Sequence, residues 1–216
     1  MIFRSVRLWA AVLCIACLGA SLSACAPIIL GSVAMGALVA TDRRTSGAQL
    51  EDEGIELRAA GRVRESVGER ARVSVTSYNR QVLLTGEVPN AQDKQLVEQI
   101  VSRVENVRSI VNELGVLGNS SLTQRSSDAL VTGRVKAAMV DTKDLFANAF
   151  KVVTERGTTY LMGRVTQREA NRATDITRST SGVQRVVRVL EIISEEELQR
   201  TLPQNPARAP APAPKP

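Results

Sequence analysis

The chain contains no histidine in its 216 residues, and aromatic residues make up only 3% of it. The absence of histidine removes the commonest general base and the commonest metal ligand of proteins. With so few aromatic side chains, we do not expect the stacking surfaces that bind sugars or single-stranded nucleic acid. We therefore expect no enzyme, no metal or other cofactor and no nucleic-acid partner.

Cysteine is also scarce, and the three that are present lie close to the start of the chain. Arg4 and Arg7 precede an apolar run over residues 8–20, which is typical of a secretory signal peptide. The run is shorter than the roughly 20 residues that a membrane-spanning helix needs. Two of the cysteines lie within it, so only Cys25 would remain after cleavage and no disulfide is expected.

Residues 22–25, with the sequence LSAC, resemble the lipobox of bacterial lipoproteins. The resemblance implies that diacylglycerol is joined to the thiol of Cys25, that residues 1–24 are removed as a signal peptide, and that the new amino group is acylated. Such an anchor holds stably, because each buried CH2 contributes about 0.8 kcal/mol. Ala26 stands where an aspartate retains enteric lipoproteins in the inner membrane, so the resemblance favours the outer membrane. The alternative is an ordinary signal peptide followed by a chance cysteine.

The next stretch, residues 25–54, is interpreted as the lipidated N-terminus and a linker. Residues 26–41 are apolar but rich in glycine, alanine and serine. They form either a flexible tether beside the bilayer or a segment that inserts shallowly or packs on itself, since small residues permit close approach. Residues 41–54 are polar and predict a linker. Removal of residues 1–24 takes two arginines from the formal charge of +6 and leaves +4 on 192 residues.

An internal repeat dominates the rest of the chain. Residues 61–64, GRVR, return as GRVK at 133–136, an offset of 72. Residues 84–88, LTGEV, return as LMGRV at 161–165, an offset of 77. The change of offset predicts five extra residues in the second copy, between Met139 and Phe150, where a loop can accept them.

Both copies show the same order of apolar patterns. In the first copy Ile55, Ala59 and Val63 recur at helical spacing, and alternating apolar segments follow. The pattern predicts α-β-β-α-β in each copy. The expected fold class is therefore α+β, with two tandem α-β-β-α-β domains, each a three-stranded sheet covered by two helices. Gly86 and Gly163, inside expected strands, predict a close backbone approach or a bulge.

The predicted domains cover residues 55–118 and 128–194, with a linker at 119–127 and a disordered Pro/Ala-rich tail at 195–216. Pro-Ala alternation favours an extended chain. The tail is therefore interpreted either as a solvated end or as a segment that extends to contact another envelope component. In the second copy the predicted elements are a helix at 128–140, strands at 150–154 and 159–165, a helix at 167–181 and a strand at 184–193.

The repeated unit, with LLTGEV and YLMGRV at its strand-to-helix corner, resembles the BON-domain family. Two such units behind a lipobox resemble the dual-BON outer-membrane lipoproteins, and the segments ATDRRT at 40–45 and GAQL at 47–50 are similar to them too. The resemblance implies periplasmic exposure, binding to anionic phospholipid and a role in keeping the outer membrane intact, with enrichment at division sites. Leu130 is a departure, because the family can have an aromatic residue suited to the membrane interface there.

Two classes of function stay open: a lipid-surface binding module, and a protein-interaction scaffold for outer-membrane assembly or cell-wall remodelling. The second copy, residues 128–194, has eleven Lys/Arg against seven Asp/Glu, whereas residues 55–117 have nine against eight. Each basic residue near an anionic bilayer contributes about 1 kcal/mol. The second copy is therefore the predicted lipid binder, unless its arginines only solvate the surface.

The first helix of the second copy supplies a specific hypothesis. Leu130 lies about 100° round the helix from the expected core residue Val131, close to basic residues. Gly133 is costly in a helix by about 1 kcal/mol, which suggests close packing or a lipid contact. Cys25 would then be only the tether, and the alternative is that Leu130 is a core residue. The predicted phospholipid-binding residues are Leu130, Gly133, Arg134 and Lys136.

Metal binding has one weak candidate in the sequence. Asp141 and Asp144 lie three residues apart in an expected loop. Two carboxylates are a small ligand set for calcium, which takes six to eight oxygen ligands. We therefore predict no metal site.

Overall fold

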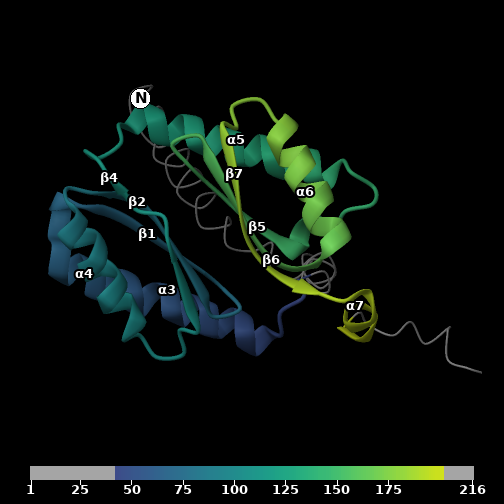
Figure 1. Cartoon of the computed structure of the whole chain (residues 1–216), viewed down its shortest axis with the longest axis horizontal. Coiled ribbons are helices and arrows are strands. Elements are labelled where there is room, and N and C mark those ends of the chain that lie inside the picture. Colours follow the sequence, from purple (N-terminus) through teal and green to yellow (C-terminus); the bar gives the residue numbers. More distant parts are fainter. Residues whose placement is uncertain (1–41, 202–216) are drawn as a thin grey trace, which may run out of the picture. The chain divides into compact units, whose positions relative to one another are not determined.

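The structure is a computed structural model that describes residues 42–201 (Figure 1). The predicted signal peptide, Cys25, residues 26–41 and the end of the tail lie outside the described residues. From Thr41 onwards the chain forms one compact unit.

The first half of this unit is a mixed sheet with two helices on one of its faces (Figure 1). The central strand β2 pairs antiparallel with β1 and parallel with β3 and with the short β4. The elements are α3 (Ser46–Val67), the 3-10 turn η2 (Gly68–Arg70), β1 (Arg72–Tyr78), β2 (Gln81–Val88), α4 (Ala91–Ser102), β3 (Ser109–Asn112) and β4 (Gly115–Val116).

The second half repeats this arrangement. Its sheet has the order β5-β6-β7, with β6 antiparallel to β5 and parallel to β7. The elements are α5 (Leu122–Val140), the 3-10 turn η3 (Ala147–Ala149), β5 (Phe150–Glu155), β6 (Thr158–Thr166), α6 (Gln167–Ser179), β7 (Arg185–Ile193) and α7 (Glu195–Thr201). The prediction of two tandem α-β-β-α-β units is confirmed. The prediction of five extra residues between Met139 and Phe150 is wrong, because Met139 matches Val63 in the core and Phe150 matches Val73 in the strand pairing, so the second copy has one extra residue there. The connection from α5 to β5 is longer mainly because α5 ends earlier than α3.

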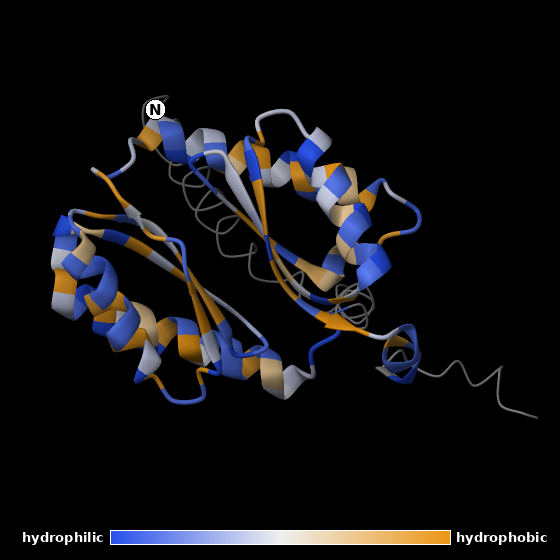
Figure 2. Ribbon diagram, in the orientation of Figure 1, coloured by the Kyte–Doolittle hydropathy of each residue, from blue (hydrophilic) through white to orange (hydrophobic). Residues whose placement is uncertain are grey.

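Each half has its own apolar core between its sheet and its two helices. Figure 2 shows the hydropathy pattern behind these cores: apolar residues form stretches along the strands, whereas apolar and polar residues alternate along the helices. The core of the first half includes Ile55, Ala59 and Val63, which are the residues that the helical spacing singled out. The core of the second half includes Val131, Val135 and Met139 at the matching positions.

A helix aspartate holds the first hairpin turn in each half. Both turns have left-handed residues, at Asn79 and Arg80 in one and at Arg156 and Gly157 in the other, as two-residue hairpin turns of this kind require. In the first half Asp52 of α3 accepts the N–H groups of both turn residues, at 2.7 and 2.8 Å. In the second half Asp128 of α5 accepts the N–H groups of Arg156 and Gly157, at 2.9 and 3.0 Å. Asp128 is the residue at which this helix was predicted to begin.

Two strand glycines allow the close approach that was predicted. A Cβ on Gly86 would lie 2.0 Å from the carbonyl oxygen of Arg72, and the φ of Gly86 is +111°. A Cβ on Gly163 would lie 2.4 Å from the carbonyl oxygen of Ala149. Any side chain at either position would collide with the backbone of the neighbouring segment.

The boundaries of several elements differ from the predictions. Helix α3 begins at Ser46, inside the expected linker, because Thr45 caps it by accepting the N–H of Ala48 at 3.1 Å. Helix α5 begins at Leu122 rather than at residue 128, because Ser121 caps it in the same way. Both helices therefore start in polar sequence that lacks the apolar spacing from which a helix is predicted.

The ends of the two halves also differ from expectation. Residues 195–201, predicted to belong to a disordered tail, form α7, in which Leu198 is buried. The last strand of the α-β-β-α-β pattern is interrupted in the first half, where it is divided into β3 and β4. At the break Leu114 is buried and its N–H donates to the side chain of Asn112 at 3.3 Å, which turns the backbone out of the ladder.

A third apolar cluster joins the two sheets. We call it the seam. It is flanked by ion pairs between the halves, for example Arg156 with Glu87 at 2.7 Å and Lys151 with Glu56 at 2.6 Å. The buried residues of the seam are Tyr78, Leu83, Tyr160, Met162 and Val189.

Candidate functional site

Helix α5 has a buried side and an exposed side. Val131, Val135 and Met139 are buried in the core of the second half. The four residues predicted from the sequence to bind phospholipid, Leu130, Gly133, Arg134 and Lys136, are all exposed on the other side.

Leu130 and Gly133 answer two questions that the sequence left open. Leu130 is 63% exposed, so it lies outside the core. Among residues 42–201, a Cβ on Gly133 would have nothing within 4 Å, so close packing against this part of the chain does not explain the glycine. Both residues are free to contact something outside the protein.

The exposed side of α5 contains more apolar residues than the sequence analysis identified. Leu122 and Val140, at 73% and 68% exposed, lie near the two ends of the helix. Their spacing of eighteen residues is five full helical turns, so they share one face. This spacing was visible in the sequence, but α5 was predicted to begin after Leu122. We call this face the α5 strip: Leu122, Ala129, Leu130, Gly133, Ala137 and Val140.

Cations border the α5 strip on both sides. At about 100° per residue, Arg125 and Lys136 lie along one edge and Arg134 along the other, and all three are exposed. The helix contains one carboxylate, Asp128, which is buried and accepts the N–H groups of the β5–β6 turn. The exposed charges of α5 are therefore all positive, and the strip between them is apolar except for Ser126.

The matching helix α3 does not have such a face. At the offset of 76, which matches Asp52 to Asp128, Gly54 occupies the place of Leu130, Glu53 that of Ala129 and Arg64 that of Val140. Helix α3 contains five carboxylates against three arginines. The exposed Leu57 of α3 is therefore surrounded by charges of both signs, and the first half offers an internal control for the second.

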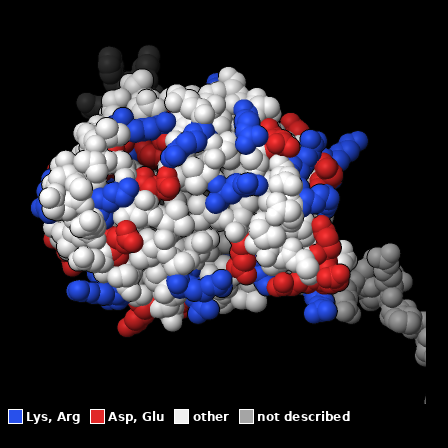
Figure 3. Space-filling model, in the orientation of Figure 1, with Lys and Arg blue, Asp and Glu red and all other residues white. Residues whose placement is uncertain are grey.

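The face of the molecule seen in Figure 3 shows mixed charge. In Figure 3 the Lys and Arg side chains are scattered over the visible face among Asp and Glu, and they form no continuous basic field there. Attraction to an anionic surface would then depend on local combinations such as the α5 strip and its three cations.

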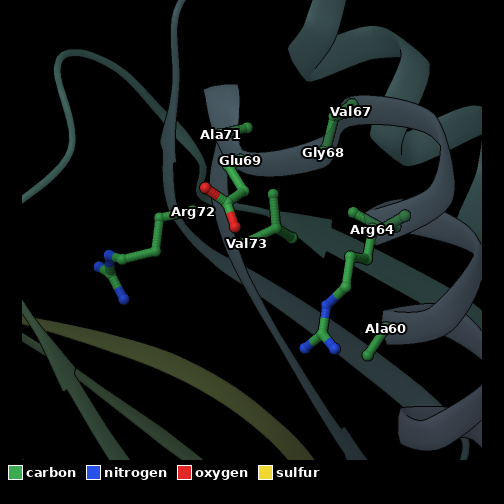
Figure 4. Close-up of a pocket in the computed structure, with 9 residues that line it drawn as sticks. Ala60, Arg64, Val67, Gly68, Glu69, Ala71, Arg72 and Val73 are labelled. Carbon is green, nitrogen blue, oxygen red and sulfur yellow. The ribbon is translucent and has the colours of Figure 1, made fainter.

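A cavity of about 430 Å³ lies in the first half, between α3, η2 and β1. Its floor includes Val63 and Val67, which are almost fully buried. Figure 4 shows that the charged groups of Arg64, Glu69 and Arg72 point in different directions. Arg72 is engaged by Glu87 at 2.8 Å and by Glu155. The cavity thus lacks the converging polar groups that fix a small ligand.

The described residues contain neither a cluster of metal ligands nor a membrane-spanning helix. In residues 42–201 no three or more Cys, Asp or Glu side chains lie close enough to hold a metal ion. Asp141 caps the end of α5, and Asp144 pairs with Arg172 at 3.6 Å. Over the same residues, no helix combines the length and the apolar character that crossing a membrane requires.

Comparison with known proteins matches this chain twice to one family model and also to two curated proteins. The BON-domain profile matches residues 55–118 and 127–194. The outer membrane lipoprotein DolP of Haemophilus influenzae is 38% identical over 174 residues, which cover 80% of this chain and 90% of that protein. The 21 kDa hemolysin of Actinobacillus pleuropneumoniae is 29% identical over 154 residues, which cover 70% of this chain and 79% of that protein.

A solved structure with partial similarity is CdsD, a structural protein of the type III secretion system of Chlamydia trachomatis. It aligns at 13% identity and a TM-score of 0.28, over 68% of this chain and 98% of that chain. A score this low supports no argument about the present protein.

Proposed function

This chain belongs to the BON-domain family, and we propose that it is a lipid-anchored outer-membrane lipoprotein whose second BON domain binds anionic phospholipid at the periplasmic face. The anchor is Cys25, and the protein supports the integrity of the outer membrane. The similarity to DolP over most of both chains supports the localisation.

The α5 strip is the observation that most strongly supports phospholipid binding. Apolar side chains at the surface of a helix, bordered by Lys and Arg, suit the boundary between headgroups and acyl chains. Three cations at about 1 kcal/mol each give an attraction on the order of 3 kcal/mol. The contribution of the leucines and Val140 adds to this as their exposed area leaves water.

The contrast between the two BON domains supports assigning this activity to the second. The first domain has the same fold and a matching helix, but the exposed leucines of that helix, Leu50 and Leu57, lie near Glu53 as well as arginines. Carboxylates beside an anionic surface oppose the attraction of the arginines. We therefore expect α5, and not α3, to lie against the bilayer.

Vesicle co-sedimentation tests this function with the unlipidated chain from Thr41 onwards, which forms a compact unit. Binding should require anionic lipid and weaken as salt rises. Arg134→Glu removes an attraction of about 1 kcal/mol and adds a repulsion of about 1 kcal/mol. The variant should therefore bind vesicles about 30-fold more weakly. Leu130→Glu should also weaken binding, whereas Leu57→Glu, at an equally exposed leucine of α3, should not.

The variants must stay folded by circular dichroism for the comparison to hold. Folded Leu130→Glu and Arg134→Glu proteins that bind like the wild type would contradict the proposal. That result would favour the second candidate, a scaffold for envelope assembly or cell-wall remodelling proteins.

A further inference from the structure

Phe146 is an exposed aromatic residue in a chain with very few aromatic residues. Its exposed fraction is 50%, whereas that of Phe150 is 6%. Phe146 lies in the loop that joins α5 to β5, which is longer than the connection from α3 to β1. Val140, the last residue of the α5 strip, precedes it by six positions, so the loop continues from the end of the strip.

The loop holds Phe146 between two anchored neighbours. Leu145 and Ala149 are both buried in the core of the second domain. The N–H of Leu145 donates to the carbonyl of Thr142 at 3.2 Å, and the N–H of Ala149 donates to the carbonyl of Phe146 at 2.9 Å. A side chain displayed in this way loses little conformational freedom when it binds.

Arg43 covers one side of the Phe146 ring. Its guanidinium carbon lies over the ring, 6.0 Å from the centroid, which is within the range of a cation–π contact. The guanidinium is fixed in turn by the carboxylate of Glu169, at 2.6 and 2.7 Å, and by the carbonyl of Arg164 at 3.1 Å. The side chains of Arg43 and Glu169 are only 5% and 1% exposed.

Glu169 is firmly placed by its own helix. It is the third residue of α6 and forms a capping box with Thr166, whose N–H donates to its carboxylate at 3.0 Å. Burial alone would raise the pKa of Glu169, but the hydrogen bonds from Arg43 and Thr166 outweigh burial and hold the pKa below its ordinary value. The carboxylate of Glu169 therefore stays charged at neutral pH and holds Arg43 over the ring.

The charges around the loop are largely compensated. Asp144 pairs with Arg172 at 3.6 Å, and its carbonyl accepts a hydrogen bond from Arg168 at 3.4 Å. Lys143 is exposed beside them. Residues 141–149 alone carry a formal charge of −1, and the contacts with Arg168 and Arg172 of α6 offset it, so an approaching anionic surface meets an aromatic ring beside compensated charge.

We propose that Phe146 inserts its ring at the headgroup–acyl boundary of an anionic bilayer and extends the α5 strip beyond the end of the helix. Arg43 is the positioning residue that orients the ring. The inference rests on the proposed phospholipid binding of α5. Aromatic side chains favour this depth of the bilayer, and apolar groups with basic neighbours are the combination that binds there.

A single tryptophan reports the insertion directly. The one tryptophan of the chain, Trp9, lies in the predicted signal peptide, so the unlipidated chain from Thr41 has none. With Phe146→Trp, anionic vesicles should shift the emission to shorter wavelength, and brominated lipid should quench it. Leu57→Trp, on the exposed face of α3, should stay at its value in water, and Leu130→Trp reports on the α5 strip itself.

The three tryptophan reporters distinguish failure of this inference from failure of the proposed function. A response from Leu130→Trp without one from Phe146→Trp overturns this inference and leaves the proposed function intact. Silence from both overturns the proposed function and this inference with it. Phe146→Ala should weaken vesicle binding about tenfold, or about 1.4 kcal/mol, and unchanged affinity of the folded variant overturns the proposal.

The role of Arg43 is tested by removing both charges of its pair. The double variant Arg43→Gln/Glu169→Gln leaves no unpaired buried ion, which would otherwise destabilise the fold. In this background the reporter at position 146 should show a smaller shift and less quenching, while the reporter at position 130 responds as before. An unchanged signal at position 146 overturns the positioning role of Arg43.

Discussion

Tyr78 and Tyr160, the two tyrosines of the chain, both lie in the seam between the two sheets. The hydroxyl of Tyr78 donates to the carbonyl of Ala149 at 3.5 Å, and that of Tyr160 donates to Glu113 at 3.4 Å. Each bond crosses from one BON domain to the other. Burial raises the pKa of each tyrosine to about 12, because a phenolate in the seam would lose its water.

The two tyrosines should therefore titrate late. A folded-state pKa above the unfolded value near 10 contributes stability that is complete below pH 10 and lost as the pH rises toward 12. Absorbance at the phenolate band should show little ionisation at pH 11 (roughly one unit above the ordinary pKa) in the folded chain and nearly full ionisation in denaturant. Titration of both residues near pH 10 in the folded protein would contradict the burial of the seam.

At the scale of elements, the two domains use glycine for opposite purposes. Gly86 lies in β2 where a Cβ would collide with the carbonyl oxygen of Arg72, so no other residue fits the backbone there. Gly133 lies on the open face of α5, where a Cβ would meet nothing among the described residues. In an exposed helix position glycine has only the entropic cost of its backbone freedom.

Alanine at these two positions should change stability in opposite directions. Gly133→Ala should raise the free energy of unfolding by about 0.5–1 kcal/mol and leave vesicle binding in place, because the α5 strip stays apolar. Gly86→Ala should lower the free energy of unfolding and reduce the yield of folded protein. Urea unfolding measures both changes, and a destabilised Gly133→Ala variant would show that α5 packs against something at that position.

At the scale of the whole molecule, buried carboxylates connect the two BON domains. Glu87 is fully buried between Arg72 of its own domain and Arg156 of the other, at 2.8 and 2.7 Å. Burial alone would raise the pKa of Glu87, but the hydrogen bonds from the two arginines outweigh it and lower the pKa. The pKa values of Asp52 and Glu169 are lowered in the same way, by hydrogen-bond donors that outweigh burial.

These carboxylates predict acid sensitivity. Groups with a lowered folded-state pKa contribute stability above their ordinary values, 4.5 for Glu and 3.8 for Asp, and lose it as the pH falls through the folded-state values. The unfolding temperature should be steady near neutral pH and fall below about pH 4.5. Glu87→Gln should cost about 1–3 kcal/mol at neutral pH and flatten the acid dependence. Thermal unfolding across the pH range measures both effects, and an acid slope equal to that of the wild type would be inconsistent with this role of Glu87.

Much of the fold was predictable from local spacing. The apolar positions of α3 and α5, the alternating strands and the hairpin turns repeat at nearly constant offset, and repeated local patterns specify repeated local structure. The first turns of α3 and α5 were not predictable from apolar spacing, because a polar cap and a buried aspartate stabilise them. In the sequence Asp52 falls in the predicted linker. In the structure its carboxylate accepts hydrogen bonds from Arg44 and from the β1–β2 turn.

The exposed side of α5 was partly determined by the sequence as well, since helical periodicity alone separates Leu130 and Arg134 from the core. The sequence could not show that Phe146 is exposed, because Phe146 lies in an irregular loop where no periodic spacing predicts burial, whereas Phe150 begins β5. Nor could it pair Arg43 with Glu169, which lie 126 residues apart. Local pattern determines the elements because their hydrogen bonds join near neighbours, whereas the ion pair, the seam and the displayed ring depend on how the two sheets pack, and only the tertiary structure decides that.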